Sequence, residues 1–329
     1  MMTIREDNEA REYTFLAPAA AKSREAVRRI PEEKCPLRTE YQRDRDRILH
    51  SKAFRRLKHK TQVYIAPADH YRTRMTHSLE VSQIARTIAR ALHLNEELTE
   101  AISLGHDVGH TPFGHIGEFA LRDLIGHFNH NEQSLRVLDV LEKDGAGLNL
   151  TAAVLDGIVH HTGEVRAQTL EGQIVRYADR IAYLSHDFDD AIRAGMLRAE
   201  ELPERVRREL GATHSGMITT MVTDVITTSS DYASVRMTPS TEAVMDEFRT
   251  FMFERVYQSP TLVPDRERGY HLVQALCKYY LTHPEALPDE HQHGKAVTET
   301  MVVDYIAGLT DHYAIRLYKE LFIPRFWDI

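Results

Sequence analysis

The sequence repeats apolar residues at helical spacing over several long stretches, and this periodicity constrains the fold more than any other feature. Between residues 76 and 93, one stripe holds Val81, Ile84, Ala85, Ile88 and Leu92. A second stretch begins at Asn95, a residue type that caps helices, and runs to about Gly109. A third covers about residues 172 to 194. We therefore expect a mostly α-helical fold, with at most a small β-hairpin near residues 61–67.

The composition is that of an ordinary globular protein. The chain has 329 residues, of which 42% are hydrophobic and 27% charged, and its formal net charge is −8. That balance gives no support to nucleic acid or an anionic membrane as the main partner. Two cysteines cannot build a disulfide framework, and no long apolar run or signal-peptide pattern is present. We expect a cytoplasmic protein with no membrane association.

Polar side chains of metal-binding type lie beside all three apolar stripes. His77 is four residues before Val81, and His106 is four residues after Ile102. Asp107 follows His106 directly, and Asp179 lies beside the third stripe. Burying such groups without a partner is costly, whereas a divalent cation with nitrogen and oxygen ligands removes that cost. The spacing predicts a site for Mn²⁺ or Mg²⁺, with Ni²⁺, Fe²⁺ and Zn²⁺ left open.

Five longer motifs carry a resemblance to a known family. They are RDRDRILHSKAFRRLKHKTQV, DHYRTRMTHSLEV, LGHDVGHTPFGHIGE, FNHNEQSLRVL and QIVRYADRIAYLSHD. Together they resemble the deoxynucleoside triphosphate triphosphohydrolases, which are dGTPase-like members of the HD-domain superfamily of metal-dependent phosphohydrolases. The resemblance implies an HD-domain fold with an N-terminal arm over 1–40, a catalytic core over 41–200 and a C-terminal helical region over 201–329, packed as one unit.

The resemblance also implies a reaction. A deoxynucleoside triphosphate (dNTP), whether dGTP or another, is cut at the α-phosphate to give the deoxynucleoside and tripolyphosphate. One metal ion per chain would be bound by His77, His106, Asp107 and Asp179. The family's catalytic histidine and glutamate fall on His115 and Glu118. Three residues apart, these two are neighbours on a helix, and the carboxylate is expected to fix the tautomer of the imidazole and raise its pKa.

Further residues match the substrate-binding positions of the family. Those that contact the triphosphate or the catalytic water correspond to Arg74, His110, His130 and Arg180. Those that contact the sugar correspond to Gln62, Tyr183 and Asp187. Two further histidines, His160 and His161, are left without a role.

Two alternative functions stay open. One is a phosphodiesterase or phosphatase with two metals, in which His110 and His115 or His130 become extra ligands. The other is a non-catalytic nucleotide-binding regulator. As partners, the resemblance implies a dNTP substrate, a dNTP activator in some members and a homo-oligomer, with a hexamer favoured. Some relatives bind single-stranded DNA, which the acidic balance of this chain does not support.

Overall fold

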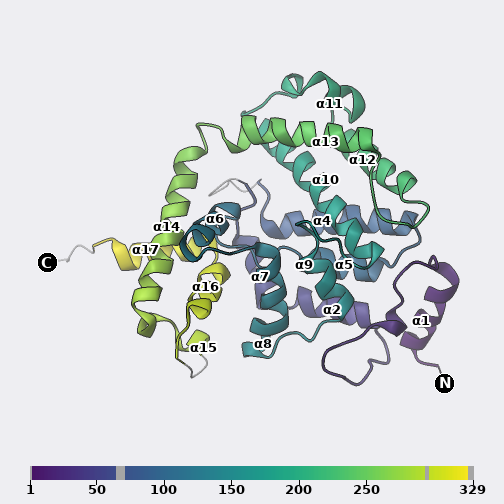
Figure 1. Ribbon diagram of the computed structural model, residues 1–329, viewed down its shortest axis with the longest axis horizontal. Coiled ribbons are helices and arrows are strands. Elements are labelled where there is room, and N and C mark those ends of the chain that lie inside the picture. The colour runs from purple at the N-terminus through teal and green to yellow at the C-terminus, as the bar shows by residue number, and fades with distance from the viewer. Residues whose placement is uncertain (1, 64–70, 293–295, 325–329) are drawn as a thin grey trace.

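The computed structural model describes residues 2–63, 71–292 and 296–324, and helices dominate it throughout (Figure 1). Strand pairing among these residues consists of two isolated antiparallel bridges, Arg28 with Thr151 and Thr61 with Thr73. The expected helical fold is confirmed. Thr61 opens the candidate hairpin, but residues 64–67 of that segment lie outside the described residues.

The helices fall into two groups along the chain. The first group is α1 (Ile4–Phe15), α2 (Glu40–Leu49), α3 (Lys52–Arg56), α4 (Arg74–Ala91), α5 (Glu96–Gly105), α6 (His115–Ile125), α7 (His130–Arg136), α8 (Glu142–Gly145) and α9 (Ala152–Val159). The second is α10 (Leu170–Arg193), α11 (Glu204–Glu209), α12 (His214–Thr228), α13 (Pro239–Met252), α14 (Val263–Thr282), α15 (Asp289–Gln292), α16 (Glu299–Gly308) and α17 (Asp311–Phe322). Between them lie the 3₁₀ turns η1 (Ser23–Glu25), η2 (Leu57–His59), η4 (Ala199–Glu201) and η6 (Pro284–Ala286), and the π-helical turns η3 (Val137–Leu141) and η5 (Phe253–Tyr257).

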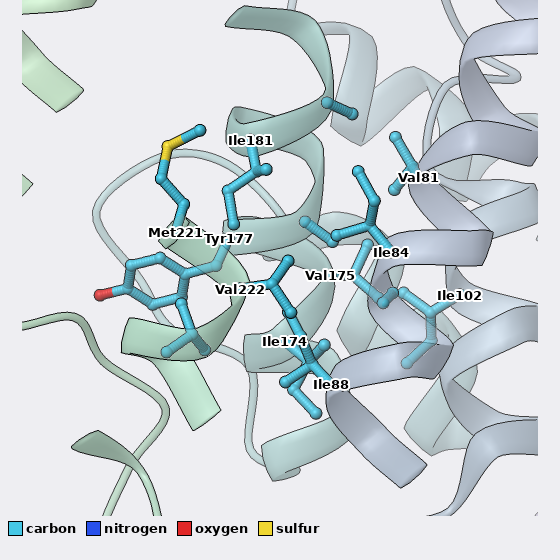
Figure 2. Packing of buried hydrophobic residues seen from close by; sticks show 14 of the residues in the cluster. Val81, Ile84, Ile88, Ile102, Ile174, Val175, Tyr177, Ile181, Met221 and Val222 are labelled. Carbon is cyan, nitrogen blue, oxygen red and sulfur yellow. The ribbon is translucent and has the colours of Figure 1, made fainter. Parts of the chain in front are cut away.

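The larger hydrophobic core, which we call the first core, lies where α4, α5 and α10 pack against one another. Figure 2 shows its centre, to which α12 also contributes. The labelled side chains are Val81, Ile84, Ile88, Ile102, Ile174, Val175, Tyr177, Ile181, Met221 and Val222. Each buried aliphatic side chain of this kind contributes about 1.5–3 kcal/mol relative to exposure. This packing therefore fixes the three helices that carry the predicted metal ligands.

A smaller hydrophobic core, the second core, lies where α6 packs against α14 and where α14 meets α16 and α17. In Figure 1 these helices gather on the side opposite α1. Its buried members include Phe113, Leu121, Phe128, Val273, Leu276, Tyr280, Val302, Ile306, Ala314 and Leu317. The expected C-terminal region thus serves both cores, because α12 and α13 belong to the first and α14, α16 and α17 to the second.

The N-terminal arm contains a helix that its apolar pattern does not show. Helix α1 begins with a capping box in which Thr3 and Glu6 satisfy each other's backbone amides. Arg5 forms an ion pair with Glu9, a glutamate that is 1% exposed (2.8 Å). Polar contacts rather than an apolar stripe stabilise this helix, so hydrophobic periodicity could not reveal it.

Within the described part of the chain, no helix combines the length and the apolar character that crossing a membrane requires.

Candidate metal centre and active site

The four predicted metal ligands converge from three helices of the first core. His77 lies on the buried face of α4, His106 caps the C-terminal end of α5, and Asp179 lies on α10. The Nε2 atom of His77 is 3.0 Å from Oδ1 of Asp179, and Nε2 of His106 is 3.8 Å from the same oxygen. Asp107 completes the group, with its carboxylate 3.5 Å from His106 and 3.9 Å from His77.

The hydrogen bonding of His106 fits a metal ligand. Its Nδ1 atom donates to the Ser103 carbonyl at 2.7 Å, which leaves the lone pair on Nε2. That Nε2 atom is buried and has no hydrogen-bond partner among the described residues. A buried acceptor without a partner costs free energy unless something binds it, and a divalent cation at Nε2 would do so. The residues present therefore fit the metal that the sequence predicts.

Both carboxylates of the group are ionised. Burial alone would raise the pKa of Asp179, but the hydrogen bond with His77 and the nearby His106 outweigh burial and lower it. The pKa of Asp107 is also well below its usual range, because neighbouring imidazoles and the Arg74 guanidinium outweigh its burial. Two ionised carboxylates beside two imidazoles make a donor set suited to a divalent cation.

Arg74, at the first position of α4, connects the metal centre to the preceding segment. Its Nη1 donates to Oδ2 of Asp107 at 2.8 Å, and its Nε donates to the Thr61 carbonyl at 3.1 Å. The guanidinium also lies against Gly114, where an added Cβ would be 2.7 Å from Nη2. Gly114 has a φ of +58°, so both its backbone conformation and the closeness of Arg74 require glycine.

The turn after Asp107 leads to the predicted proton-transfer pair. His115 and Glu118 begin α6, and His115 Nδ1 is 3.0 Å from Oε2 of Glu118. Burial would raise the pKa of Glu118, but hydrogen bonds with His115 and His130 lower it far below its usual range. The sequence argument expected Glu118 to raise the pKa of His115. Glu118 does raise it, but desolvation, Arg74 and His130 together lower it by more, so the pKa of His115 lies below its usual value.

His110 and His130 lie between the metal ligands and this pair. Nε2 of His110 is 3.2 Å from Oδ1 of Asp107, and its ring stacks on that of His130 with centroids 4.0 Å apart. Nδ1 of His130 is 3.1 Å from Oε2 of Glu118. Burial and then the nearby cations hold the pKa of His110 well below its usual range, so this imidazole is neutral.

His161, which the sequence left without a role, belongs to the site. Its Nε2 is 3.3 Å from Nε2 of His130, and its ring centroid is 4.9 Å from that of His106. Burial and the two neighbouring histidines lower the pKa of His161 to about 3. Its neighbour His160 instead pairs with Asp156 on α9.

The ligand atoms of the site fall into several compact groups, each within 4.8 Å. One contains His77, His106 and Asp107, and a second contains His106, His161 and Asp179. A third contains Asp107, His130 and His161, and a fourth contains His110, His115, Glu118 and His130. Asp107 and His161 are shared between groups, so the geometry offers more than one position for a cation.

Two of the three predicted sugar-binding residues, Tyr183 and Asp187, lie on α10 beyond Asp179, and the third, Gln62, precedes α4. Burial raises the pKa of Tyr183 to about 12 and that of Asp187 to about 7. The Tyr257 hydroxyl, from η5, donates to Oδ2 of Asp187 at 2.5 Å. Oε1 of Gln62 is buried without a partner among the described residues. At neutral pH a carboxyl with this pKa is about half protonated, so Asp187 can both donate and accept hydrogen bonds.

Comparison with known proteins decides the family. Residues 74–184 match the HD domain, and residues 235–320 match the phosphohydrolase-associated domain. A deoxyguanosinetriphosphate triphosphohydrolase-like protein of Caldanaerobacter subterraneus subsp. tengcongensis is 53% identical over 99% of this chain and 98% of its own. Proteins with the same description from Desulfatibacillum aliphaticivorans and Clostridium tetani are 47% and 43% identical, each over 98% of this chain and over 99% and 97% of their own. The chain belongs to the deoxyguanosinetriphosphate triphosphohydrolase-like family of HD-domain phosphohydrolases.

One predicted substrate residue of this dGTPase-like protein is directed elsewhere. Arg180 points to α13, where its Nη2 is 3.0 Å from Asp246 and its Nη1 is 3.8 Å from Glu242. Its side chain is 24% exposed, so the pair is open to water. A phosphate would have to compete with two carboxylates for this guanidinium.

Sequence reasoning missed two residues that the structure places in the site. His161 is three residues after the buried Ile158 and seven after Val154, so it continues the apolar stripe of α9 and could have been found. Tyr257 contacts Asp187, which is 70 residues earlier in the chain, and no local sequence pattern indicates that contact.

A cavity of about 470 Å³ lies behind the metal-binding turn of this phosphohydrolase. Its lining includes Val108, Gly109 and Lys60 but none of the four metal ligands. An added Cβ at Gly109 would lie 2.1 Å from the Ser134 backbone nitrogen, so this turn packs directly on α7. The cavity therefore shares the Val108–Gly109 part of this turn with the candidate metal centre but none of its predicted ligands.

Proposed function

We propose that this protein hydrolyses deoxynucleoside triphosphates, dGTP among them, at the α-phosphate and releases the deoxynucleoside and tripolyphosphate. One observation carries the proposal: the buried Nε2 of His106, which has no hydrogen-bond partner in the described part of the chain, lies among His77, Asp107 and Asp179. The His115–Glu118 pair lies in the same site. The printed name of the relatives, together with identities of 43–53% over nearly the full chain, supports the same substrate class.

The binding steps use the cations and the neutral imidazole of the site. A divalent cation bound by His77, His106, Asp107 and Asp179 would neutralise charge on the α-phosphate and make a bound water more acidic. Arg74, at 2.8 Å from Asp107, would bind phosphate oxygens beside that centre. His110 is neutral and within hydrogen-bond distance of Asp107, so it can bind a phosphate oxygen or orient the attacking water.

The proton reaches the leaving group through His115. Water attacks the α-phosphorus, the bond from phosphorus to the 5′ oxygen breaks, and that oxygen takes a proton from Nε2 of the charged His115. The attacking water gives up one proton to solvent, and Nε2 of His115 takes up a proton from solvent before the next cycle. Glu118 accepts a hydrogen bond from Nδ1 of His115 and stabilises the charged imidazole. The free protein lowers the pKa of His115, and the negative charge of a bound triphosphate would raise it again.

Selection of the sugar would depend on Gln62 and on residues that follow Asp179 on α10. Tyr183 and Asp187 lie four residues apart on α10, and Asp187 is bonded to Tyr257. A carboxyl with a pKa of about 7 and the open amide oxygen of Gln62 suit hydrogen bonds to a 3′-hydroxyl. The Tyr183 ring would exclude a 2′-hydroxyl by contact.

Product analysis tests the proposal. Each dNTP alone, and all four together, are incubated with the protein and Mn²⁺ or Mg²⁺, and the products are separated by anion exchange. Deoxynucleoside plus tripolyphosphate supports the proposal, and turnover only in the mixture would reveal activation by a second nucleotide. Release of diphosphate or stepwise phosphate contradicts it. No turnover under any condition would favour the nucleotide-binding regulator.

A second candidate function follows from His161. Asp107, His130 and His161 could bind a second cation, as a binuclear phosphodiesterase or phosphatase would require. Metal analysis of the purified protein separates the two: one ion per chain fits the proposed triphosphohydrolase. Two ions, one of them lost in His161→Ala, together with cleavage of diesters or monophosphates, would fit the alternative.

The homo-oligomer, the activating nucleotide and the cytoplasmic location stay predictions from the family resemblance and the composition. A sizing measurement with light scattering, with and without dNTP, tests the first two together.

A further inference from the structure

The catalytic segments of the site are tied to a single place in the C-terminal region, which we call the α16–α17 corner (residues 304–311). This corner includes the end of α16 and the first residue of α17. It supplies no metal ligand and none of the residues assigned above to substrate binding. Yet three segments that carry functional side chains form hydrogen bonds to it.

Asp311 makes the most extensive of these contacts. Its Oδ1 accepts from the Phe113 backbone amide at 2.9 Å. Its Oδ2 accepts from the Thr61 backbone amide at 2.8 Å and also from the Thr61 hydroxyl. The side chain is buried, with 7% of the residue exposed. One carboxylate therefore joins two segments that are 52 residues apart in sequence.

Both of those segments lead directly to proposed active-site groups. Phe113 precedes Gly114 and His115, and it has a φ of +62°, an unfavourable conformation for a residue with a side chain. Thr61 precedes Gln62, and its carbonyl accepts from Arg74, which in turn pairs with Asp107. Hydrogen bonds from Asp311 thus fix the strained residue before His115 and the support of Arg74.

Lys60, which precedes Thr61, and Asp304, which lies in the corner, make two further links between the corner and the site. Lys60 is fully buried, and its ammonium donates to the carbonyls of His110 and Ala307. Asp304 accepts from Gln133 at 3.0 Å and from Arg136 at 2.7 Å, which fixes α7, the helix that begins with His130. Hydrogen bonds therefore link this one corner to the 60–61, 110–113 and 133–136 segments.

We propose that Asp311 is a positioning residue, and that the α16–α17 corner sets the placement of His115 and Arg74 relative to the metal centre. The inference rests on the proposed hydrolysis of dNTPs for its kinetic consequence. Its structural part, that the carboxylate restrains the turn at Phe113, stands independently of which phosphate ester the protein cleaves.

The test variant is Asp311→Asn in the full-length, metal-loaded protein. An amide group cannot accept all three hydrogen bonds, since its NH₂ end would face an N–H donor. We expect kcat to fall on the order of 10- to 100-fold, with a smaller change in KM and an unchanged metal content. The backbone amides around Phe113 should exchange with deuterium faster than in the wild type.

Glu299→Gln is the matched control. Glu299 occupies the same first position in α16, after a threonine cap, as Asp311 does in α17, but it is exposed. Both variants lose the same favourable interaction with the helix dipole, and only one loses contacts to the turn. Thr61→Val and Thr61→Ser give a second test, because only serine retains the hydroxyl that donates to Asp311. Thr61→Ser should keep most of the activity that Thr61→Val loses.

Specific results would overturn the proposal. One is an Asp311→Asn protein whose kcat per folded molecule equals that of Glu299→Gln, and another is unchanged exchange at Phe113. If the wild type cleaves no dNTP, the proposed function fails, and the exchange measurement still decides whether Asp311 restrains the turn.

Discussion

The two hydrophobic cores of this protein carry different parts of its proposed chemistry. All four metal ligands lie on or directly after helices of the first core, which α4, α5 and α10 build. The proton-transfer pair His115 and Glu118 lies on α6, whose Ala120 and Leu121 are buried in the second core. Metal binding and proton transfer therefore depend on the packing of different cores, so a substitution in one core should impair one function and spare the other.

The seam between the cores is short. It includes the turn from Asp107 to Gly114, the approach of Arg74 to Gly114 and the links from the α16–α17 corner. Variants on either side of this seam test whether metal binding and proton transfer are lost separately.

The largest effect is expected for Asp107→Ala, on the metal side. The variant loses a metal ligand and leaves the buried Arg74 guanidinium without its carboxylate. Metal content should fall to background together with activity, and the free energy of unfolding should fall by about 3–5 kcal/mol. Metal analysis and urea unfolding measure both. Asp265→Ala, at an exposed first-turn position of α14, should change neither, and a metal-loaded Asp107→Ala protein would contradict the ligand assignment.

His115→Gln is the matching change on the other side of the seam. Its side chain is 60% exposed, so its loss should cost little stability. We expect kcat to fall on the order of 10²- to 10⁴-fold while the metal content stays at the wild-type value. His127→Gln controls for the loss of an exposed histidine that pairs with a glutamate. Turnover within about twofold of wild type would remove His115 from its role.

Core truncations compare the two packings directly. Ile102 in the first core and Leu121 in the second are both fully buried, and changing either to alanine should cost about 2–5 kcal/mol of unfolding free energy. At temperatures where both variants are folded, Ile102→Ala should weaken metal affinity. Leu121→Ala should leave metal affinity unchanged and lower kcat. Equal effects of both variants on metal affinity would show that the cores are not separate in function.

The smallest effect is expected for the pH dependence of stability, through the predicted sugar-binding residue Asp187. Burial raises the pKa of Asp187 to about 7 in the folded protein, against an ordinary value near 4 when unfolded. Between about pH 4 and 7 the folded state therefore binds more protons, and stability should decrease with rising pH by about 1 kcal/mol per unit. Asp187→Asn should lose this slope when unfolding is measured at several pH values, whereas Asp265→Asn should keep it. Parallel curves for wild type and Asp187→Asn would contradict the raised pKa.

The sequence could predict the parts of the site that follow local spacing. His77 and His106 are four residues from buried members of their stripes, and helical geometry brings both to the first core. The long helices around them have clear apolar faces and were expected for the same reason. Helix α1 was missed because polar contacts stabilise it.

Contacts between residues far apart in the sequence leave no such periodic pattern. Asp311 meets Thr61 from 250 residues away, and Tyr257 meets Asp187 from 70 residues away, so neither contact leaves a period to detect. Arg180 has the right charge for a phosphate, but the sequence could not show that α13 places Asp246 beside it. Family resemblance supplied roles for Asp187 and Arg180, and only the packing supplies their partners.

The second core can form only late in synthesis, because its helices come from distant parts of the chain. Helix α6 is made early, but the residues that bury Leu121 and Phe128 come from α14, α16 and α17, which end at Phe322. Every metal ligand precedes residue 180, and most of the first core is complete well before the ribosome reaches α14. A nascent chain can therefore assemble its cation site long before His115 is held in place.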